Sequence, residues 1–169
     1  LRGLMERHAI DPLDFLAAAH VIDTSPLPVC GNLADAIKAL PGRKFVFTNG
    51  SVKHAENVTG AMKIDHLFDG MFGIETADFL PKPHQPTYDK FCSRFGIDPN
   101  ASAFFEDLAR NLTPAKAMGF STILVHSDKD WSHEPEAARP ANRDTSPIGE
   151  NKHIDYTTGE LTAFLQAIG

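Results

Sequence analysis

The chain has 169 residues, a length that fits one domain with a substantial core. Apolar residues make up 42% and charged residues 22% of it, which is ordinary for a soluble globular protein. The formal net charge of −6 argues against a nucleic-acid backbone or an anionic membrane as the main partner. A local positive site for a phosphate group is still compatible with this charge.

Cysteine usage and hydropathy indicate the cellular compartment in which the protein is expected. Cys30 and Cys92 have no motif spacing, so free thiols in a reducing compartment are favoured over a disulfide. No apolar run reaches the length of a membrane span, and no signal peptide is recognisable. The cytoplasm is therefore the expected location. Because the chain opens on Leu1 rather than Met, an upstream targeting segment stays an open alternative.

The first part of the chain is expected to be helical. Asp11-Pro12 predicts an N-cap followed by proline at the first helical position. The amphipathic helix that follows carries Leu13, Phe15, Leu16, Ala19 and His20. A proline-rich stretch at 24–28 ends it. Because residues 1–28 show no strand pattern, we interpret them as part of a helical cap, separate from a core at 29–169.

In the core, short apolar strands alternate with helices. The expected strands are 44–48, 71–74, 103–105, 122–125 and 153–156. The expected helices are 32–40, 51–62, 87–95, 113–119 and 161–168, the last opened by a capping box at Thr157 and Glu160. This alternation predicts an α/β fold with a Rossmann-like parallel sheet and helices on both faces. Residues 127–152 form a polar excursion, either a surface loop or a flexible flap.

Polar residues follow two of the expected strands. Thr48, Asn49 and Gly50 come after the first strand, and Glu106-Asp107 come after the third. In parallel sheets, ligands bind beyond the carboxyl ends of the strands. The Thr48 hydroxyl and the N–H groups of Asn49 and Gly50 can bind an anion at the start of the next helix. Taken alone, a threonine that caps this helix is the more common arrangement.

A lysine and two carboxylates add charge to this pattern. Lys82 lies between two prolines, which restrict its backbone and lower the entropy cost of holding its ammonium in place. It could therefore neutralise a phosphoryl group. Most loop lysines are simply solvated, and this is the alternative. Glu106 and Asp107 repel each other, and Mg²⁺ would relieve this repulsion. A solvent-facing N-cap pair is the alternative. Asn111 could orient the loop or a metal-bound water, and an ordinary turn asparagine is an equal alternative.

These motifs together resemble the haloacid dehalogenase (HAD) superfamily of hydrolases, and within it the pyrimidine 5′-nucleotidase-like phosphatases. The segment Phe45-Val46-Phe47-Thr48-Asn49 is similar to the second motif of the family, and Pro81-Lys82-Pro83 to the third. Phe104-Phe105-Glu106-Asp107 with Asn111-Leu112 is similar to the fourth. The resemblance implies that Thr48 and Asn49 bind the phosphoryl group, Lys82 stabilises it, and Asp107, helped by Glu106, holds the cofactor Mg²⁺.

The chain also departs from the family pattern. The first motif, Asp-x-Asp-x-Thr, supplies the aspartyl nucleophile, and no apolar strand ending in Asp-x-Asp precedes Thr48. The resemblance places this motif upstream of Leu1. The segment 22–25 is a poor substitute, and we interpret it as a turn that ends a helix. Leu108 stands where the family commonly has serine.

Three functions follow as hypotheses. The first is a Mg²⁺-dependent phosphomonoester hydrolase that forms an aspartyl-phosphate on pyrimidine nucleoside 5′-monophosphates or similar small phosphates, with residues 1–169 alone inactive. The second is a catalytically silent remnant that binds phosphate or a protein partner. The third is a haloacid dehalogenase, which does not need the Glu106-Asp107 pair. The expected partner is a small phosphorylated substrate, without a nucleic-acid polymer or a membrane, and the sequence does not indicate the oligomeric state.

Overall fold

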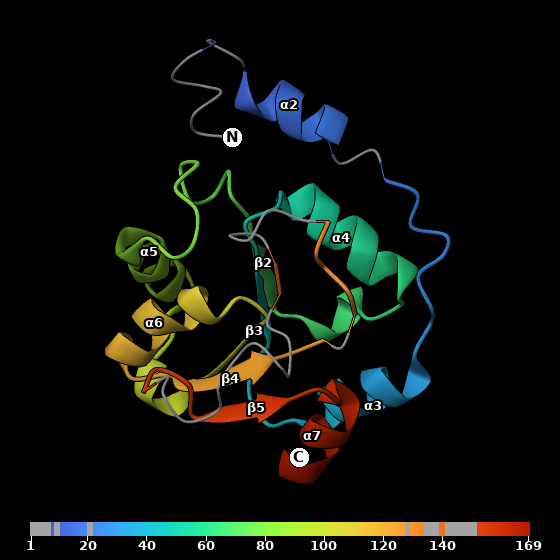
Figure 1. Ribbon diagram of the computed structural model, residues 1–169, viewed down its shortest axis with the longest axis vertical. Coiled ribbons are helices and arrows are strands. Elements are labelled where there is room, and N and C mark those ends of the chain that lie inside the picture. Colours follow the sequence, from blue (N-terminus) through green and yellow to red (C-terminus); the bar gives the residue numbers. More distant parts are fainter. Residues whose placement is uncertain (1–7, 9–10, 20–21, 128, 134–138, 141–151) are drawn as a thin grey trace. The chain divides into compact units, whose positions relative to one another are not determined.

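The computed structural model describes residues 8, 11–19, 22–127, 129–133, 139–140 and 152–169 (Figure 1). The chain divides into two compact units, Leu1–Lys82 with Leu165–Gly169, and Pro83–Phe164. Each unit contains parallel strands and helices, which confirms the predicted α/β class. Most of the polar excursion at 127–152 and His20 lie outside the described residues.

The N-terminal helix has the predicted cap. Helix α2 spans Pro12–Ala19, and the backbone N–H groups of Leu13 and Asp14 donate to Asp11 Oδ1 at 2.8 and 3.4 Å. Leu16 is buried, whereas Leu13 on the same helix is exposed. The chain then turns at the predicted place, where Ser25 N donates to the Asp23 carboxylate at 2.9 Å.

The first unit contains a two-stranded parallel sheet. Its elements are α3 (Gly31–Ala39), β1 (Phe45–Phe47), α4 (Val52–Ala61), the 3-10 helix η1 (Asp65–Leu67) and β2 (Gly70–Phe72). The strands β1 and β2 pair with Phe47 opposite Phe72, and these two rings meet edge to face at 5.2 Å. The bond from Thr48 N to the Phe72 carbonyl oxygen, at 2.9 Å, continues the ladder into the turn after β1.

The second unit contains a three-stranded parallel sheet. Its elements are α5 (Gln85–Phe95), the 3-10 helix η2 (Pro99–Ala101), β3 (Ala103–Glu106), α6 (Ala109–Met118), β4 (Ser121–Val125) and β5 (Tyr156–Thr158). The strand order is β3-β4-β5, and Figure 1 shows β4 and β5 as adjacent arrows. Helix α6 packs against β3 and β4. The rings of Tyr88 and Phe120 flank Phe104 at 5.8 and 5.6 Å and form part of the core. The final helix, α7 (Leu161–Ile168), crosses the boundary between the two units.

Two element boundaries differ from the prediction by three residues or more. Helix α6 begins at Ala109 rather than Thr113, so Pro114 lies inside the helix. Proline removes one helical hydrogen bond, and burial of Leu112 and Ala115 against the sheet offsets that loss. Strand β5 begins at Tyr156 rather than at residue 153, because the residues just before it bind the start of β4 instead.

The prediction that Thr157 and Glu160 form a capping box before α7 was wrong. Thr157 lies inside β5, so it cannot be the N-cap of the helix. The hydroxyl of Thr158 accepts a hydrogen bond from Glu160 N at 3.0 Å instead.

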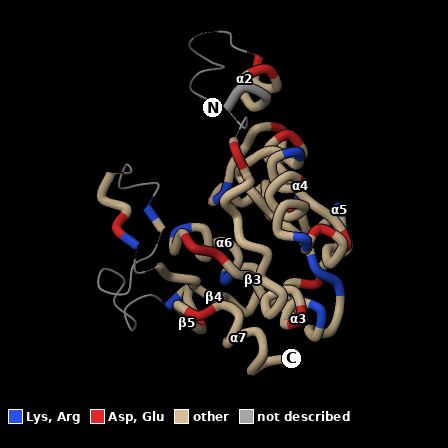
Figure 2. Tube along the Cα trace, turned by 90° about the vertical axis from the view of Figure 1, so that its right-hand side faces the viewer, with Lys and Arg blue, Asp and Glu red and all other residues tan. Residues whose placement is uncertain are grey.

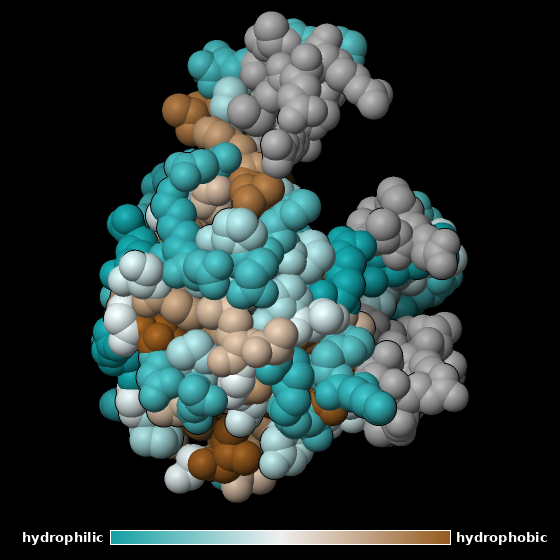
Figure 3. Space-filling view, turned by 90° about the vertical axis from the view of Figure 1, so that its left-hand side faces the viewer, coloured by the Kyte–Doolittle hydropathy of each residue, from teal (hydrophilic) through white to brown (hydrophobic). Residues whose placement is uncertain are grey.

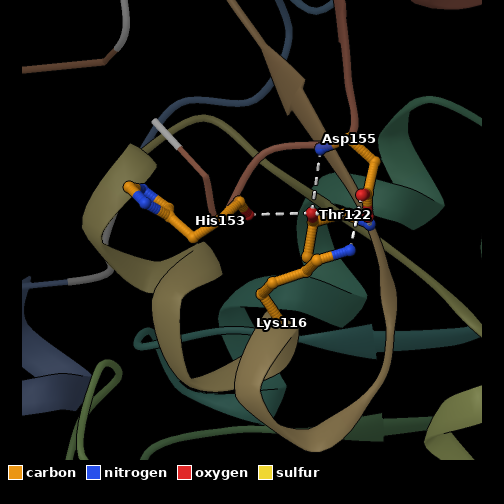
Figure 4. Close-up of polar contacts among 4 residues, drawn as sticks. All are labelled: Lys116, Thr122, His153 and Asp155. Carbon is orange, nitrogen blue, oxygen red and sulfur yellow. Dashed lines mark hydrogen bonds and ion pairs between the residues drawn. The ribbon is translucent and has the colours of Figure 1, made fainter. Parts of the chain in front are cut away.

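A polar network holds the chain where it returns to the sheet (Figure 4). The backbone N–H of Thr122 donates to Asp155 Oδ2 at 2.9 Å, and its hydroxyl donates to the His153 carbonyl oxygen at 2.8 Å. Asp155 N donates to Thr122 Oγ1 at 3.1 Å, and Lys116 Nζ pairs with Asp155 Oδ1. The Lys116 hydrogen bond, and next the Thr122 N–H, lower the pKa of Asp155. The network therefore joins the end of α6, the start of β4 and the segment before β5.

Charge and hydropathy are mixed over the described surface. Acidic and basic residues are interspersed along the tube in Figure 2, as a modest net charge would suggest. The face drawn in Figure 3 carries separate hydrophobic patches among hydrophilic residues. The exposed large apolar side chains include Leu13, Ile22, Val29, Tyr156 and Ile168. Within the described part of the chain, no helix has both the length and the apolar character needed to cross a membrane.

Candidate active site

The turn after β1 is held by its own side chains and by the segment after β2. Gly50 N donates to Thr48 Oγ1 at 2.9 Å, so the threonine hydroxyl folds back over the turn. Ser51 caps α4 by accepting a hydrogen bond from His54 N at 3.1 Å. Ile74 N donates to the Gly50 carbonyl oxygen at 2.9 Å. The predicted anion site therefore lies on a turn with a defined shape at the start of a helix.

A glutamate and a glycine that sequence reasoning missed also hold this turn. Val52 N, at the first position of α4, donates to Glu75 Oε1 at 2.8 Å. The other oxygen, Glu75 Oε2, is buried and has no hydrogen-bond partner among the described residues. A Cβ on Gly73 would lie 2.5 Å from Val52 N and 2.6 Å from Glu75 Oε2. Gly73 lies inside the expected strand 71–74, and a glycine within a strand often marks a place where another backbone approaches closely. The sequence therefore contained a signal for this contact.

Lys82 is a buried lysine rather than a solvated loop residue. Its exposed fraction is only 8%, and its Nζ donates to the Phe47 carbonyl oxygen at 2.8 Å. The same nitrogen lies 4.9 Å from the centroid of the Phe47 ring, a cation–π distance. The ammonium group is therefore located at the carboxyl end of β1, directly before Thr48.

The side chain of Asn49 joins the turn to the loop that carries Lys82. Lys82 N donates to Asn49 Oδ1 at 2.7 Å, and Asn49 Nδ2 donates to the Lys82 carbonyl oxygen at 3.2 Å. Thr48, Asn49, Gly50 and Lys82 all belong to the first unit. Within that unit, the structure brings the second-motif turn into direct contact with Lys82 of the third motif.

The predicted metal ligands belong to the second unit. Glu106, at the end of β3, is buried, and its Oε1 accepts hydrogen bonds from Asp107 N at 3.1 Å and Leu108 N at 3.2 Å. Asp107 is exposed. Asn111, in the first turn of α6, is only 1% exposed, and its Oδ1 has no partner among the described residues. The two carboxylates are therefore not a matched pair that faces solvent.

The donor chemistry of these residues fits Mg²⁺ in part. Carboxylate and amide oxygens are the hard ligands that Mg²⁺ prefers, and the buried, unpaired Asn111 Oδ1 is an oxygen in need of a partner. Among the described residues, however, no three His, Cys, Asp or Glu side chains are grouped as a metal site would require. Asp107 would supply one acidic ligand, with the charge of Glu106 beside it, and the site would stay incomplete.

Tyr88 binds the first turn of α6, which carries Asn111, and sequence reasoning did not identify it. Its hydroxyl donates to the Asn111 carbonyl oxygen at 2.6 Å, and its side chain extends from α5, is fully buried and packs against the Phe104 ring of β3. Burial, and next the charge of Glu106, raise the pKa of the Tyr88 phenol. The tyrosine therefore stays protonated and available as a hydrogen-bond donor.

Curated relatives with similar sequences are phosphatases. A phosphoglycolate phosphatase of Haemophilus influenzae (strain 86-028NP) is 26% identical over 114 residues, which cover 59% of this chain and 50% of the relative. An enolase-phosphatase E1 of Frankia alni is 33% identical over 86 residues, which cover 49% of this chain and 36% of the relative. The chain thus spans about half or less of the length of these relatives.

Solved structures with the same fold give a consistent result. A predicted phosphoglycolate phosphatase from Haemophilus somnus matches with a TM-score of 0.61 and 24% identity, over 84% of this chain and 56% of that structure. An L-2-haloacid dehalogenase from Xanthobacter autotrophicus matches with a TM-score of 0.60 and 17% identity, over 86% and 62%. At these identities the two structures support the fold alone. Residues 4–119 also match the family model of the haloacid dehalogenase-like hydrolases, and the chain belongs to that family.

Proposed function

We propose that this chain carries the phosphate-binding and metal-binding residues of a Mg²⁺-dependent phosphomonoester hydrolase. The observation that carries the proposal is the buried Lys82, whose backbone is hydrogen-bonded to Asn49 and whose Nζ lies at the end of β1 beside Thr48. Burying a lysine is costly unless its charge is used or well solvated by the protein. Its position next to the Thr48 turn, where the sequence predicts anion binding, supports a phosphoryl group as the ligand.

The residues of the first unit would bind and stabilise the phosphoryl group. The Thr48 hydroxyl and the backbone N–H of Asn49 would donate to its oxygens, with the Gly50 N–H as a further donor once the Thr48 hydroxyl turns towards the ligand. The Lys82 ammonium would stabilise the charge that develops as the phosphoryl group is transferred. The structure already holds the Lys82 backbone and ammonium in place, whereas the Thr48 side chain would have to turn.

Asp107, Glu106 and Asn111 would hold the metal in the second unit. In phosphoryl transfer, bound Mg²⁺ supplies neutralising charge. The exposed Asp107 carboxylate is the direct ligand in this proposal. Glu106 binds the backbone N–H groups of Asp107 and Leu108, so it orients the loop and adds negative charge beside the ligand. Asn111 is the supporting oxygen donor.

The nucleophile of the proposed reaction is an aspartate that precedes Thr48 in the complete protein. It would attack phosphorus and form an aspartyl-phosphate, which water then hydrolyses. We therefore expect the 1–169 polypeptide by itself to hydrolyse no phosphomonoester. Magnesium-dependent turnover by a purified, mass-verified 1–169 polypeptide would show that a different residue is the nucleophile.

We further propose pyrimidine nucleoside 5′-monophosphates as substrates and the cytoplasm as the location. Resemblance to the pyrimidine 5′-nucleotidase-like phosphatases supports the substrate, and the free thiols Cys30 and Cys92 suit a reducing compartment. The similarity to a phosphoglycolate phosphatase keeps 2-phosphoglycolate as a rival substrate.

A substrate screen of the complete protein tests the proposal. It should include UMP, CMP, 2-phosphoglycolate, sugar phosphates and, without Mg²⁺, 2-chloropropionate. A highest kcat/KM for UMP or CMP would support the proposed nucleotide substrates. A preference for another phosphomonoester would reject these substrates and still support a phosphatase. Metal-independent dehalogenation would reject the phosphatase, and no turnover of any compound would favour the catalytically silent protein.

A further inference from the structure

The Pro81-Lys82-Pro83 loop has one backbone N–H group, and Asn49 binds it. Neither proline has an N–H, so Lys82 N is the only backbone donor of the three residues. That donor bonds to Asn49 Oδ1 at 2.7 Å, the shorter of the two bonds that join these residues. The Lys82 carbonyl oxygen accepts from Asn49 Nδ2 at 3.2 Å. One side-chain amide therefore pairs with both polar groups of the Lys82 backbone, 33 residues along the chain.

The position of the Lys82 ammonium depends on this backbone. The residue is buried, with an exposed fraction of 8%, and its Nζ donates to the Phe47 carbonyl oxygen at 2.8 Å. Phe47, Thr48 and Asn49 are consecutive, so the backbone and the tip of Lys82 are both tied to the same short segment. A shift of the Lys82 backbone would move its ammonium away from the end of β1.

We propose that the Asn49 side chain is a positioning residue that acts through Lys82, while the Asn49 backbone N–H faces the phosphoryl group. This inference rests on the proposed function. The carbonyl end of the amide accepts from Lys82 N and would repel an anion, and the amino end already donates to the Lys82 carbonyl. The side chain thus organises the site, and the developing charge is stabilised by Lys82.

Chemical labelling of lysines tests the structural part of the proposal without any activity measurement. The complete protein is treated with a limiting amount of acetic anhydride, and acetylation of each lysine is measured by mass spectrometry. In Asn49→Ala, acetylation of Lys82 relative to Lys53 should rise about fivefold, the scale of one lost hydrogen bond. Lys53 is a suitable internal reference because its side chain is 78% exposed.

Asn57→Ala is the matched control for the labelling. Asn57 is an exposed residue on α4 in the same unit, so its replacement should leave the Lys82 ratio unchanged. If Asn49→Ala does not fold, Asn49→Asp keeps an acceptor for Lys82 N but places a charged oxygen against the Lys82 carbonyl oxygen, so a rise is again expected. An unchanged Lys82 ratio in a folded Asn49 variant would overturn the proposal.

A double-mutant cycle tests whether Asn49 acts through Lys82. We expect Asn49→Ala to lower kcat of the complete enzyme, and to have almost no further effect when Lys82 is already alanine. If the kcat losses of the two single variants multiply in the double variant, the Asn49 side chain acts on the substrate itself. That result would overturn the inference and leave the proposed phosphatase activity standing. An inactive wild-type enzyme would reject the proposed function alone, because the labelling experiment still decides how Asn49 and Lys82 are coupled.

Discussion

The ammonium of Lys82 donates to the carbonyl oxygen of Phe47 at 2.8 Å and lies over the ring of the same residue. This contact locates a buried positive charge at the carboxyl end of β1, where the chain enters the Thr48 turn. In an α/β protein, that end of a parallel strand is where ligands are expected. The lysine and the turn therefore lie together in the first unit, at the strand end where a ligand is expected.

Lys82→Ala should lower kcat/KM of the complete enzyme by at least about a hundredfold, the scale seen when one preorganised charge-stabilising donor is removed. Steady-state kinetics on the preferred phosphomonoester would measure the loss. Lys53→Ala is the control, because Lys53 is an exposed lysine on α4 and its loss should leave the rate nearly unchanged. A loss in Lys82→Ala below about threefold would remove Lys82 from the catalytic residues.

Asp107→Asn should abolish Mg²⁺-dependent activity of the complete protein and leave its fold intact. The substitution keeps the size of this exposed side chain and removes the negative charge that a hard cation requires. Activity would be measured across a Mg²⁺ titration, and folding by circular dichroism. Asp89→Asn, at an exposed position on α5, should retain activity at every concentration. Full activity in Asp107→Asn would show that the metal is held elsewhere.

Gly73→Ala should destabilise the protein by about 1–3 kcal/mol, because its Cβ would overlap the backbone where β2 meets the start of α4. Gly60→Ala is the matched comparison. Gly60 lies inside α4 with open space around it, so alanine should stabilise the helix by about 0.5–1 kcal/mol. Urea unfolding of the two variants would measure both effects. If Gly73→Ala and Gly60→Ala have equal free energies of unfolding, the backbone of Gly73 is not in close contact with Val52 and Glu75.

Asp155 should contribute stability that is lost in acid. Its pKa is lowered in the folded protein from an ordinary value of 3.8, chiefly by the hydrogen bond from Lys116 and next by Thr122 N–H. A lowered folded-state pKa gives stability that is present in full above the unfolded pKa and disappears as the pH falls through the folded pKa. The stability difference between wild type and Asp155→Asn should therefore shrink as the pH falls from about 6 to about 3.

Urea unfolding at a series of pH values measures this difference. Lys116→Met is the companion variant, since it removes the first cause of the shift and should weaken the same pH dependence. A difference between wild type and Asp155→Asn that is constant with pH would mean that the network in Figure 4 does not bind the ionised carboxylate preferentially.

Local signals in the sequence located most of the secondary structure and the polar residues that follow the strands. Asp11-Pro12 predicted the start of α2, and the predicted helix ends at 95 and 119 agree with α5 and α6, which are capped by Gly96 and Gly119 at positive φ. The failures occurred where distant contacts override a local signal. Pro114 was expected at the start of a helix, and it lies inside α6 because burial of the surrounding turn outweighs the lost hydrogen bond.

The sequence by itself determined the family motifs, the α/β class and the identity of Thr48, Asn49, Lys82, Glu106 and Asp107 as candidate residues. Only the tertiary structure decided what these side chains do locally. It buries Lys82 on the Phe47 carbonyl, pairs Asn49 with the Lys82 backbone, and turns Glu106 onto the N–H groups of the following residues. The Asn49–Lys82 contact joins residues 33 positions apart, and Glu75 reaches Val52 across 23 positions. No local pattern predicts such pairs, because they depend on how β1 and β2 lie side by side and bring the loops that follow them together.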